Sequence, residues 1–292
     1  MPVLEDVALA EVERELAQLR KDPSAEGAPD LRMSTMTHVA WVPEPWYERA
    51  ISTLRGMGDR HPSRTIMLVP EPNEPESRID AELEVERFPL DSVGRRVCAE
   101  VIVLRLKGRR ANAPASIVQP LLISGLPVFL RWRGEPPWST APFEELVDLV
   151  DRLVVNSAEW DDLPYAYGKL AAVFDRATVS DLAWARTLGW RRSVAELWPG
   201  VAEARQLRVV GPLACALLLH GWLGGRLGIE IELEHAEAGG EDVESVAIDG
   251  REVTPPRGER PSGSDLLSDE LDVHVRDGVY EQAAAQAVSS AA

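Results

Sequence analysis

The chain has 292 residues, about the length of two domains, and 45% of them are hydrophobic, which is ordinary for a protein with a folded core. Its 48 acidic and 31 basic residues give a formal net charge of −17, which argues against non-specific binding to nucleic acid or to an anionic membrane surface. The sequence has no run approaching the roughly 20 apolar residues of a membrane span, and its charged N-terminus lacks the apolar stretch of a signal peptide. These features predict a soluble, cytoplasmic protein.

The negative charge is concentrated near the C-terminus. Residues 229–292 hold 16 acidic and 4 basic residues, a net charge of −12, and the preceding 228 residues carry a net of only −5. The simpler interpretation is a solvated face that keeps the protein in solution. The alternative is an acidic patch that steers a basic surface of a partner, which would make association sensitive to salt.

The first 30 residues predict a helix followed by a linker. Leu9, Val12, Leu16 and Leu19 follow one another at spacings of 3, 4 and 3, which places them along one face of a helix. This helix either packs on its own domain or docks a partner. The segment Asp22–Asp30 is rich in Pro, Gly and Asp, as expected of a linker or loop.

Residues 31–162 predict an α/β domain. Short apolar runs typical of strands buried on both faces occur at His38–Val42, Thr65–Val69, Val97–Leu106, Pro127–Leu130 and Leu153–Val155. Helical stretches lie between them at Trp46–Gly58, Ala113–Ile123 and Phe143–Val150. Residues 79–86 alternate apolar and acidic side chains, which predicts a strand with one wet face at an edge of the sheet. The alternation of strands and helices predicts a three-layer domain with a mostly parallel sheet.

Residues 163–278 predict an α+β domain, and residues 279–292 a flexible tail. Helices are expected at Tyr165–Arg176, Asp181–Trp198 and Pro212–Leu227, the last of which is apolar almost all round. Alternating strands of an antiparallel sheet are expected at Ile229–Leu233, Val246–Ile248 and Leu271–Val275.

A search for catalytic chemistry finds almost nothing. The sequence contains no phosphate-binding glycine loop, no G-x-S-x-G elbow and no H-E-x-x-H, and its five histidines include no pair at helical spacing. We therefore expect no catalytic residue, no metal and no cofactor, and a protein that is not an enzyme. Cys98 and Cys215 lie 117 positions apart in apolar contexts, which predicts buried, reduced thiols.

Tryptophan and arginine gather in two stretches, Leu126–Trp138 and Asp181–Arg192, and these residue types are enriched at the hot spots of protein interfaces. A third feature is the turn Arg60–Arg64, whose last arginine either pairs with an acidic side chain or contacts an anion or a partner. The competing interpretation of the tryptophans is that they seal a domain core. The candidate partner-binding residues are Arg64, Trp132, Trp138, Trp184, Arg186, Trp190 and Arg191.

These stretches also carry a resemblance to a known family. The relevant segments are RHPSR (60–64), VCAEVIVLRLKG (97–108), SIVQPLLISGLPVFLRW (116–132), DRLVVNS (151–157), DLAWARTLGWR (181–191) and LLLHGWLGGRLG (217–228). In this order they resemble the glucose-6-phosphate dehydrogenase assembly protein (OpcA) family of actinobacteria and cyanobacteria over nearly the whole chain, thinning after about Leu233. The resemblance implies a non-catalytic, chaperone-like activator that binds glucose-6-phosphate dehydrogenase and favours its active oligomer in the oxidative pentose-phosphate pathway.

The chain departs from the family pattern at two places. Ser63 stands where a cysteine is expected, and Asn156 stands where relatives often have an aspartate. The resemblance associates cyanobacterial members with thioredoxin-dependent redox control, and Cys98 and Cys215 are the only cysteines here that could take part in it.

A second hypothesis is a small-molecule-binding protein or an enzyme, with a sugar phosphate as the ligand. Its site would be the crevice at the end of the strand Pro127–Arg131, because α/β domains bind ligands outside the carboxyl ends of their strands. A sensor that binds such a ligand and then docks on a partner would combine the two hypotheses.

Overall fold

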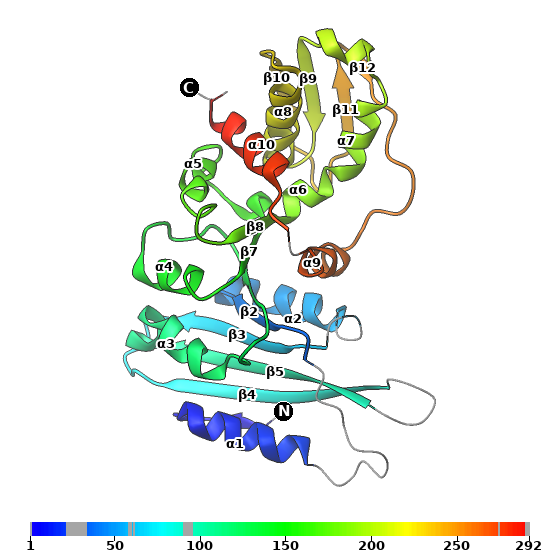
Figure 1. Ribbon diagram of the computed structural model, residues 1–292. Helices are drawn as coiled ribbons and strands as arrows, with labels where there is room; N and C mark the ends of the chain where they lie inside the picture. The colour runs from blue at the N-terminus through cyan, green and yellow to red at the C-terminus, as the bar shows by residue number, and fades with distance from the viewer. Residues whose placement is uncertain are drawn as a thin grey trace. The chain divides into compact units, whose positions relative to one another are not determined.

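A computed structural model of the chain describes residues 2–21, 34–57, 60, 62–89, 96–273 and 275–289 (Figure 1). The chain divides into two units, Met1–Val154 and Val155–Ala292, and the sequence-based boundary at residue 162 falls eight residues later. The mixed α/β class is confirmed. The expected linker at residues 22–30, the last three residues of the expected tail, His61, His274 and the side chain of Cys98 lie outside the described residues.

A mostly parallel sheet forms the centre of the first unit, as expected. Its strands are β1 (Val3–Leu4), β2 (Thr37–Trp41), β3 (Arg64–Glu71), β4 (Ile79–Pro89), β5 (Arg96–Lys107), β6 (Val128–Trp132) and β7 (Arg152–Val155). They lie in the order β1-β4-β5-β3-β2-β6-β7. The pairs β5–β3, β3–β2, β2–β6 and β6–β7 are parallel, whereas β4 is antiparallel to both β5 and β1.

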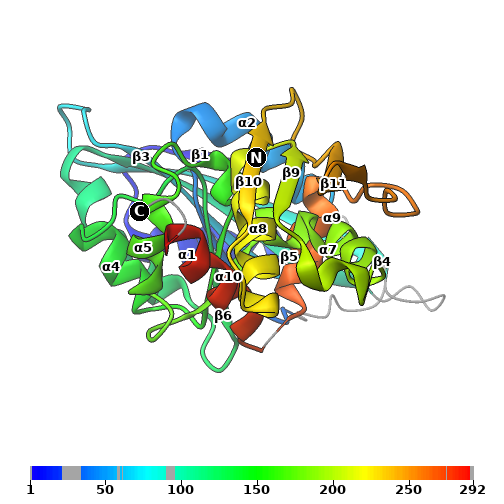
Figure 2. The same ribbon diagram turned by 90° about the horizontal axis from the view of Figure 1, so that it is seen from above.

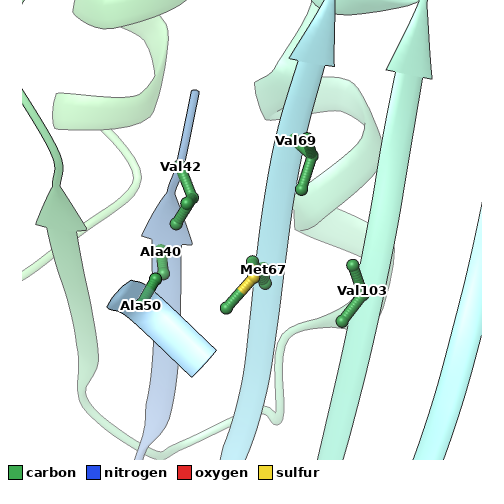
Figure 3. Close-up of a cluster of buried hydrophobic side chains, with 6 residues drawn as sticks. All are labelled: Ala40, Val42, Ala50, Met67, Val69 and Val103. Carbon is green, nitrogen blue, oxygen red and sulfur yellow. The ribbon is translucent and has the colours of Figure 1, made fainter. Parts of the chain in front are cut away.

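Helices cover both faces of this sheet. They are α1 (Leu9–Arg20), α2 (Tyr47–Arg55), α3 (Pro114–Val118) and α4 (Ala141–Val147), and the expected helix at 113–123 ends as a 3₁₀ turn at Gln119–Leu121. On the face that α2 covers, parallel register places Ala40, Met67 and Val103 side by side (Figure 3). Ala50 of α2 packs on this row, and together with Val42 and Val69 these side chains form a buried cluster.

The alternation in β4 divides its side chains between two environments. Ala81 and Leu83 are fully buried, and α1 packs against this strand with its own buried Val12 and Leu16. The intervening Glu82 and Glu84 are only half-buried on the other face. Only the two-residue β1 lies beyond β4, so the wet strand is one place from the edge of the sheet.

The second unit combines helices with a smaller mixed sheet. Its helices are α5 (Tyr165–Ala171), α6 (Leu182–Arg186), α7 (Leu188–Ala195), α8 (Leu213–Leu227), α9 (Gly263–Leu271) and α10 (Gly278–Ser289). Besides β8 (Thr178–Asp181), its strands are β9 (Gln206–Val210), β10 (Glu232–Ala236), β11 (Ser245–Ile248) and β12 (Arg251–Glu252), with the last four in the order β10-β9-β11-β12. The expected antiparallel pairing holds for β9–β11 and β11–β12. The pair β9–β10 is parallel, because α8 crosses over between these strands.

Three local expectations for this unit are wrong. The helix expected at 181–198 is two helices that meet at Thr187, and Asp181 ends strand β8 and caps α6. The described residues of the expected strand Leu271–Val275 form no strand, because Leu271 ends α9 and lies with Leu266 and Leu267 on its buried face. The expected flexible tail contains α10, whose Tyr280 and three alanines are buried.

Helices α8 and α10 lie side by side in both views (Figures 1 and 2). Gly221 of α8 makes this approach possible, because a Cβ atom there would overlap the carbonyl oxygen of Ala283 and lie 3.0 Å from the amide nitrogen of Ala287. The close approach of the two helices therefore explains why a glycine stands at this position.

Gly221→Ala is expected to lower the free energy of unfolding by about 2 kcal/mol, because two helix backbones would have to separate. Gly225→Ala is the matched control four residues along the same helix. A Cβ atom there would meet only the flexible side chain of Gln286, at 3.4 Å. The control should be neutral or slightly stabilising, since alanine favours helix over glycine. Urea unfolding of both variants measures the difference, and equal midpoints would contradict this account of α8 and α10.

Candidate functional site

Four of the seven candidate residues meet at a cleft of about 530 Å³ in the second unit. Trp184, Arg186, Trp190 and Arg191 line it from α6 and α7, and the Pro-rich loop at residues 255–261 lines it from another side. The break between α6 and α7 aligns these side chains, because the buried hydroxyl of Thr187 donates to Trp184 O at 2.7 Å and accepts from Arg191 Nε at 3.0 Å.

Arg191 and Trp184 form a stacked pair at this cleft. The guanidinium carbon of Arg191 lies 3.4 Å from the centre of the Trp184 ring, and Trp184 Nε1 donates to Asp277 Oδ2 at 2.8 Å. Burial lowers the pKa of Arg191 to about 10, so the side chain is still charged at neutral pH. Within the described ranges no carboxylate oxygen lies within 4 Å of this guanidinium. Arg191 can therefore offer charge and a flat apolar face to a ligand or partner.

Arg186 and Trp190 serve the unit's own structure. The buried Arg186 side chain pairs with Asp242 at 2.7 Å and with Glu241 at 2.6 Å, and the Trp190 indole donates to Val243 O at 3.3 Å. Both side chains hold the segment that leads into β11. Trp190 therefore helps to seal the core of the second unit, as the competing interpretation of the tryptophans predicted, and it does not form an exposed contact surface.

The three candidates in the first unit do not meet at one surface. Arg64 is buried and donates to Glu100 Oε2 at 2.7 Å, to Glu13 and to Leu121 O, which ties α1 to the sheet. Trp132 is 1% exposed, stacked on Trp41 with ring centres 4.8 Å apart. Trp138 is half-buried against Phe143, and its Nε1 donates to Glu135. A partner could reach Trp138, whereas Arg64 and Trp132 are enclosed.

The crevice proposed for a small ligand is also filled by side chains of its own unit. At the carboxyl end of β6, Arg131, Trp132 and Arg133 are all buried. Arg133 donates through its backbone to Trp41 O and through its guanidinium to Thr53 Oγ1. This edge therefore presents none of the three to a sugar phosphate in the present arrangement.

An apolar pocket of about 320 Å³ was missed by the sequence analysis. It lies between the segment after α7 and the helix α8, and its residues include Trp198, Trp222, Leu223 and Leu227, with Arg226 at the rim. Trp198 is 65% exposed, which is unusual for so large an apolar side chain. The pattern that could have revealed the pocket is Trp222 and Arg226 at i,i+4 on an otherwise apolar helix.

A buried polar network lies at the centre of the second unit. Asp181 accepts from Ser157 Oγ at 2.6 Å, from the backbone amides of Ser157 and Ala183, and from the Tyr280 hydroxyl at 3.3 Å. The Tyr167 hydroxyl donates to Ser157 Oγ at 2.9 Å. Burial is the main cause that raises the pKa of Asp181 to about 6 and the pKa of Tyr280 well above its usual value. These groups satisfy one another, so the network joins β8, α5 and α10.

The described nucleophile candidates are not activated. Ser157 bonds to a carboxylate and a tyrosine and meets no histidine among the residues that the structure describes. Cys215 is fully buried, and burial raises the pKa of its thiol to about 12, which opposes oxidation and nucleophilic attack. No group of three or more His, Cys, Asp or Glu in the described residues is arranged to hold a metal ion, and none of the described helices could cross a membrane.

Comparison with known proteins settles the family. Residues 56–172 match the family model described as the glucose-6-phosphate dehydrogenase subunit N-terminal domain (OpcA_G6PD_assem), and residues 177–284 match the corresponding C-terminal domain (OpcA_G6PD_C). The chain belongs to the OpcA family. The first match runs 18 residues past the boundary between the two structural units, and the second extends through about half of α10.

Curated relatives carry the same family name. The chain is 26% identical over 197 residues to a protein of Nostoc punctiforme and 26% identical over 160 residues to one of Synechococcus elongatus, both provisionally named OxPP cycle protein OpcA. These matches cover 63% and 51% of this chain but only 42% and 36% of the relatives. This OpcA-family chain therefore corresponds to less than half the length of the curated relatives it matches.

Proposed function

We propose that this chain is a non-catalytic factor that binds glucose-6-phosphate dehydrogenase and favours its active oligomer in the cytoplasmic oxidative pentose-phosphate pathway. The observation that carries the proposal is the pair of consecutive family matches, both described as domains of a glucose-6-phosphate dehydrogenase subunit. The relatives' names place them in the same cycle.

The surfaces of the second unit support binding rather than chemistry. Trp198 offers an exposed aromatic side chain beside an apolar pocket, and Arg191 offers a charged guanidinium stacked on Trp184. Trp and Arg are the side chains that most often dominate binding energy at protein interfaces. Ser157 and Cys215 are buried, and their side chains contribute to the stability of the fold.

A binding protein changes an assembly equilibrium only by differential affinity. If the chain binds the active oligomer more tightly than the separate subunits, it raises the population of that oligomer, and a tenfold ratio of affinities corresponds to about 1.4 kcal/mol. No catalytic group from this chain is needed for such an effect.

Sedimentation velocity of the dehydrogenase with and without this chain tests the proposal. The expected result is a new complex containing both proteins and a shift of the dehydrogenase toward its larger form. Trp198→Ala is expected to weaken the complex about 30-fold, since truncating a hot-spot tryptophan costs roughly 2 kcal/mol. Tyr165→Ala is the control, because Tyr165 is also exposed but lies outside the apolar pocket. Absence of any complex would contradict the proposed function.

A further inference from the structure

A groove of about 250 Å³ lies in the first unit on the face of the sheet that α2 covers. Its floor includes Ala99 and Val101 of β5 and Thr65 of β3. One wall consists of Ile51 and Leu54 of α2. The other wall is a row of alternating glutamates on β4, namely Glu82, Glu84 and Glu86.

The helix layer on this face leaves the groove open. Ala50 of α2 packs on the Ala40–Met67–Val103 row, which crosses β2, β3 and β5. Toward β4 the apolar floor continues to Val101, which is only partly buried, and helix α1 packs against β4 from the opposite face. The groove is thus a partly apolar strip between α2 and the row of glutamates.

Most of the charged residues among the described lining of the groove are acidic. Glu48, Glu82, Glu84 and Glu86 line it, and Arg55 is the only Lys or Arg among its described lining residues, which also include His38. Arg105 lies 3.9 Å from Glu82, but its closer partners are Glu44 and Glu71 at 2.9 Å.

The remaining glutamates have no close counter-charge. Within the described part of the chain, no Lys, Arg or His nitrogen lies within 4 Å of Glu48, Glu84 or Glu86. Burial and the neighbouring Glu84 raise the pKa of Glu86, which shows that these like charges oppose one another. Like charges on alternate residues of one strand face repel one another, so the row is unfavourable for the isolated unit.

We propose that this groove binds a cationic amphipathic segment of the protein partner. Its apolar side chains would lie on Val101, Ile51 and Leu54, and its Lys or Arg side chains would pair with Glu84, Glu86 and Glu48. The inference rests on the proposed function, because it takes that partner to be glucose-6-phosphate dehydrogenase.

The size and the chemistry of the groove favour a protein segment over a small ligand. Pockets that enclose small organic ligands measure roughly 300–1,000 Å³, and this groove is smaller. A partner's side chains need only enter it in part while the segment itself lies outside. Partial burial also strengthens the ion pairs, since a carboxylate that has lost water attracts a cation more strongly than an exposed one does.

The double variant Glu84→Gln/Glu86→Gln tests the groove, because it removes two charges and keeps the shape of the side chains. The matched control is Glu230→Gln/Glu232→Gln, which makes the same change of net charge on exposed residues of the second unit. Affinity of each for glucose-6-phosphate dehydrogenase is measured by titration calorimetry at low and at physiological ionic strength.

The groove variant is expected to bind about tenfold more weakly than the unmodified chain and to lose much of the salt dependence. The control should bind within twofold of the unmodified chain. Thermal unfolding of the groove variant should be unchanged or slightly higher, because it relieves repulsion, so weaker binding will not reflect misfolding.

The possible results distinguish the proposal about the groove from the proposed function. Equal affinity of the groove variant and the unmodified chain contradicts the groove and leaves the proposed function standing. Weakening by the control alone also contradicts the groove, and it supports the C-terminal acidic face as the steering surface. If the unmodified chain does not bind the dehydrogenase, the proposed function and the groove both fail.

Discussion

Asp181→Ala is expected to lower the free energy of unfolding of the second unit by about 4 kcal/mol. The substitution leaves four buried donors without their acceptor, namely two groups of Ser157, the amide of Ala183 and the hydroxyl of Tyr280. Each unsatisfied buried donor costs roughly 1–3 kcal/mol, and the N-cap of α6 is lost as well. Chemical unfolding monitored by tryptophan fluorescence provides the measurement.

Asp181→Asn separates hydrogen bonding from charge. Burial raises the pKa of Asp181 in the folded protein to about 6 from its usual 3.8, so the folded state binds the proton more tightly than the unfolded state does. The stability that this group contributes is therefore complete below about pH 4 and is lost as the pH rises through 6, a difference of about 3 kcal/mol. Asn keeps the shape and several hydrogen bonds but cannot ionise.

The asparagine variant should therefore lose this fall in stability between pH 4 and 6 and match or exceed the unmodified chain at pH 7. Glu230→Ala, a change of an exposed acidic residue in the same unit, is the control and should alter stability by less than about 0.5 kcal/mol. If Asp181→Ala were no more harmful than Glu230→Ala, the network would not be what joins β8, α5 and α10.

Arg64→Ala is expected to destabilise the first unit by about 3–5 kcal/mol. The substitution removes the 2.7 Å ion pair of Glu100, a carboxylate that is 1% exposed, and breaks the link from the sheet to Glu13 of α1. Glu100 keeps its 3.2 Å ion pair with Arg20 but loses its closest partner, and a buried charge that is less well compensated costs more than the loss of an exposed pair. The measurement is urea unfolding of the variant beside the unmodified chain.

A second change at Glu100 checks the cause. Arg64→Ala/Glu100→Gln also removes the buried charge that has lost its closest partner and should recover part of the lost stability, whereas independent sites would give additive losses. Additive losses in this cycle would contradict the buried-pair explanation. Arg64→Lys should recover little, because lysine cannot donate to Glu100, Glu13 and Leu121 O at once.

The hydrophobic pattern of the sequence correctly predicted the strands whose side chains have the same kind of surroundings along the whole strand. The apolar runs of β2, β3 and β6 gave a buried parallel sheet, and the alternation in β4 predicted its wet face. The prediction failed where tertiary contacts outweigh local pattern. The run Leu271–Val275 alternates like a strand, but Leu271 completes the buried face of α9. The alanine-rich C-terminus resembles a tail until Tyr280 packs with Asp181, a residue 99 positions earlier.

For the candidate site, too, some features could be predicted from the sequence and others could not. The sequence analysis correctly singled out Trp184 and Arg191, but they meet across the break between α6 and α7, which the spacing did not predict. Composition alone could not tell that Arg64 and Trp132 are enclosed, since the partners of Arg64 come from three separate elements. The apolar pocket beside the exposed Trp198 forms where the segment after α7 meets α8, so neither stretch of sequence predicts it alone.

If the proposed function is correct, this chain raises the activity of glucose-6-phosphate dehydrogenase without chemistry of its own. The most direct measurement is the activity of the dehydrogenase diluted until its oligomer dissociates, titrated with this chain. The expected result is a saturable recovery of dehydrogenase activity that is complete near stoichiometric amounts of this chain. With the Trp198→Ala variant, recovery should require higher concentrations. Activity that does not change at any ratio would contradict the account.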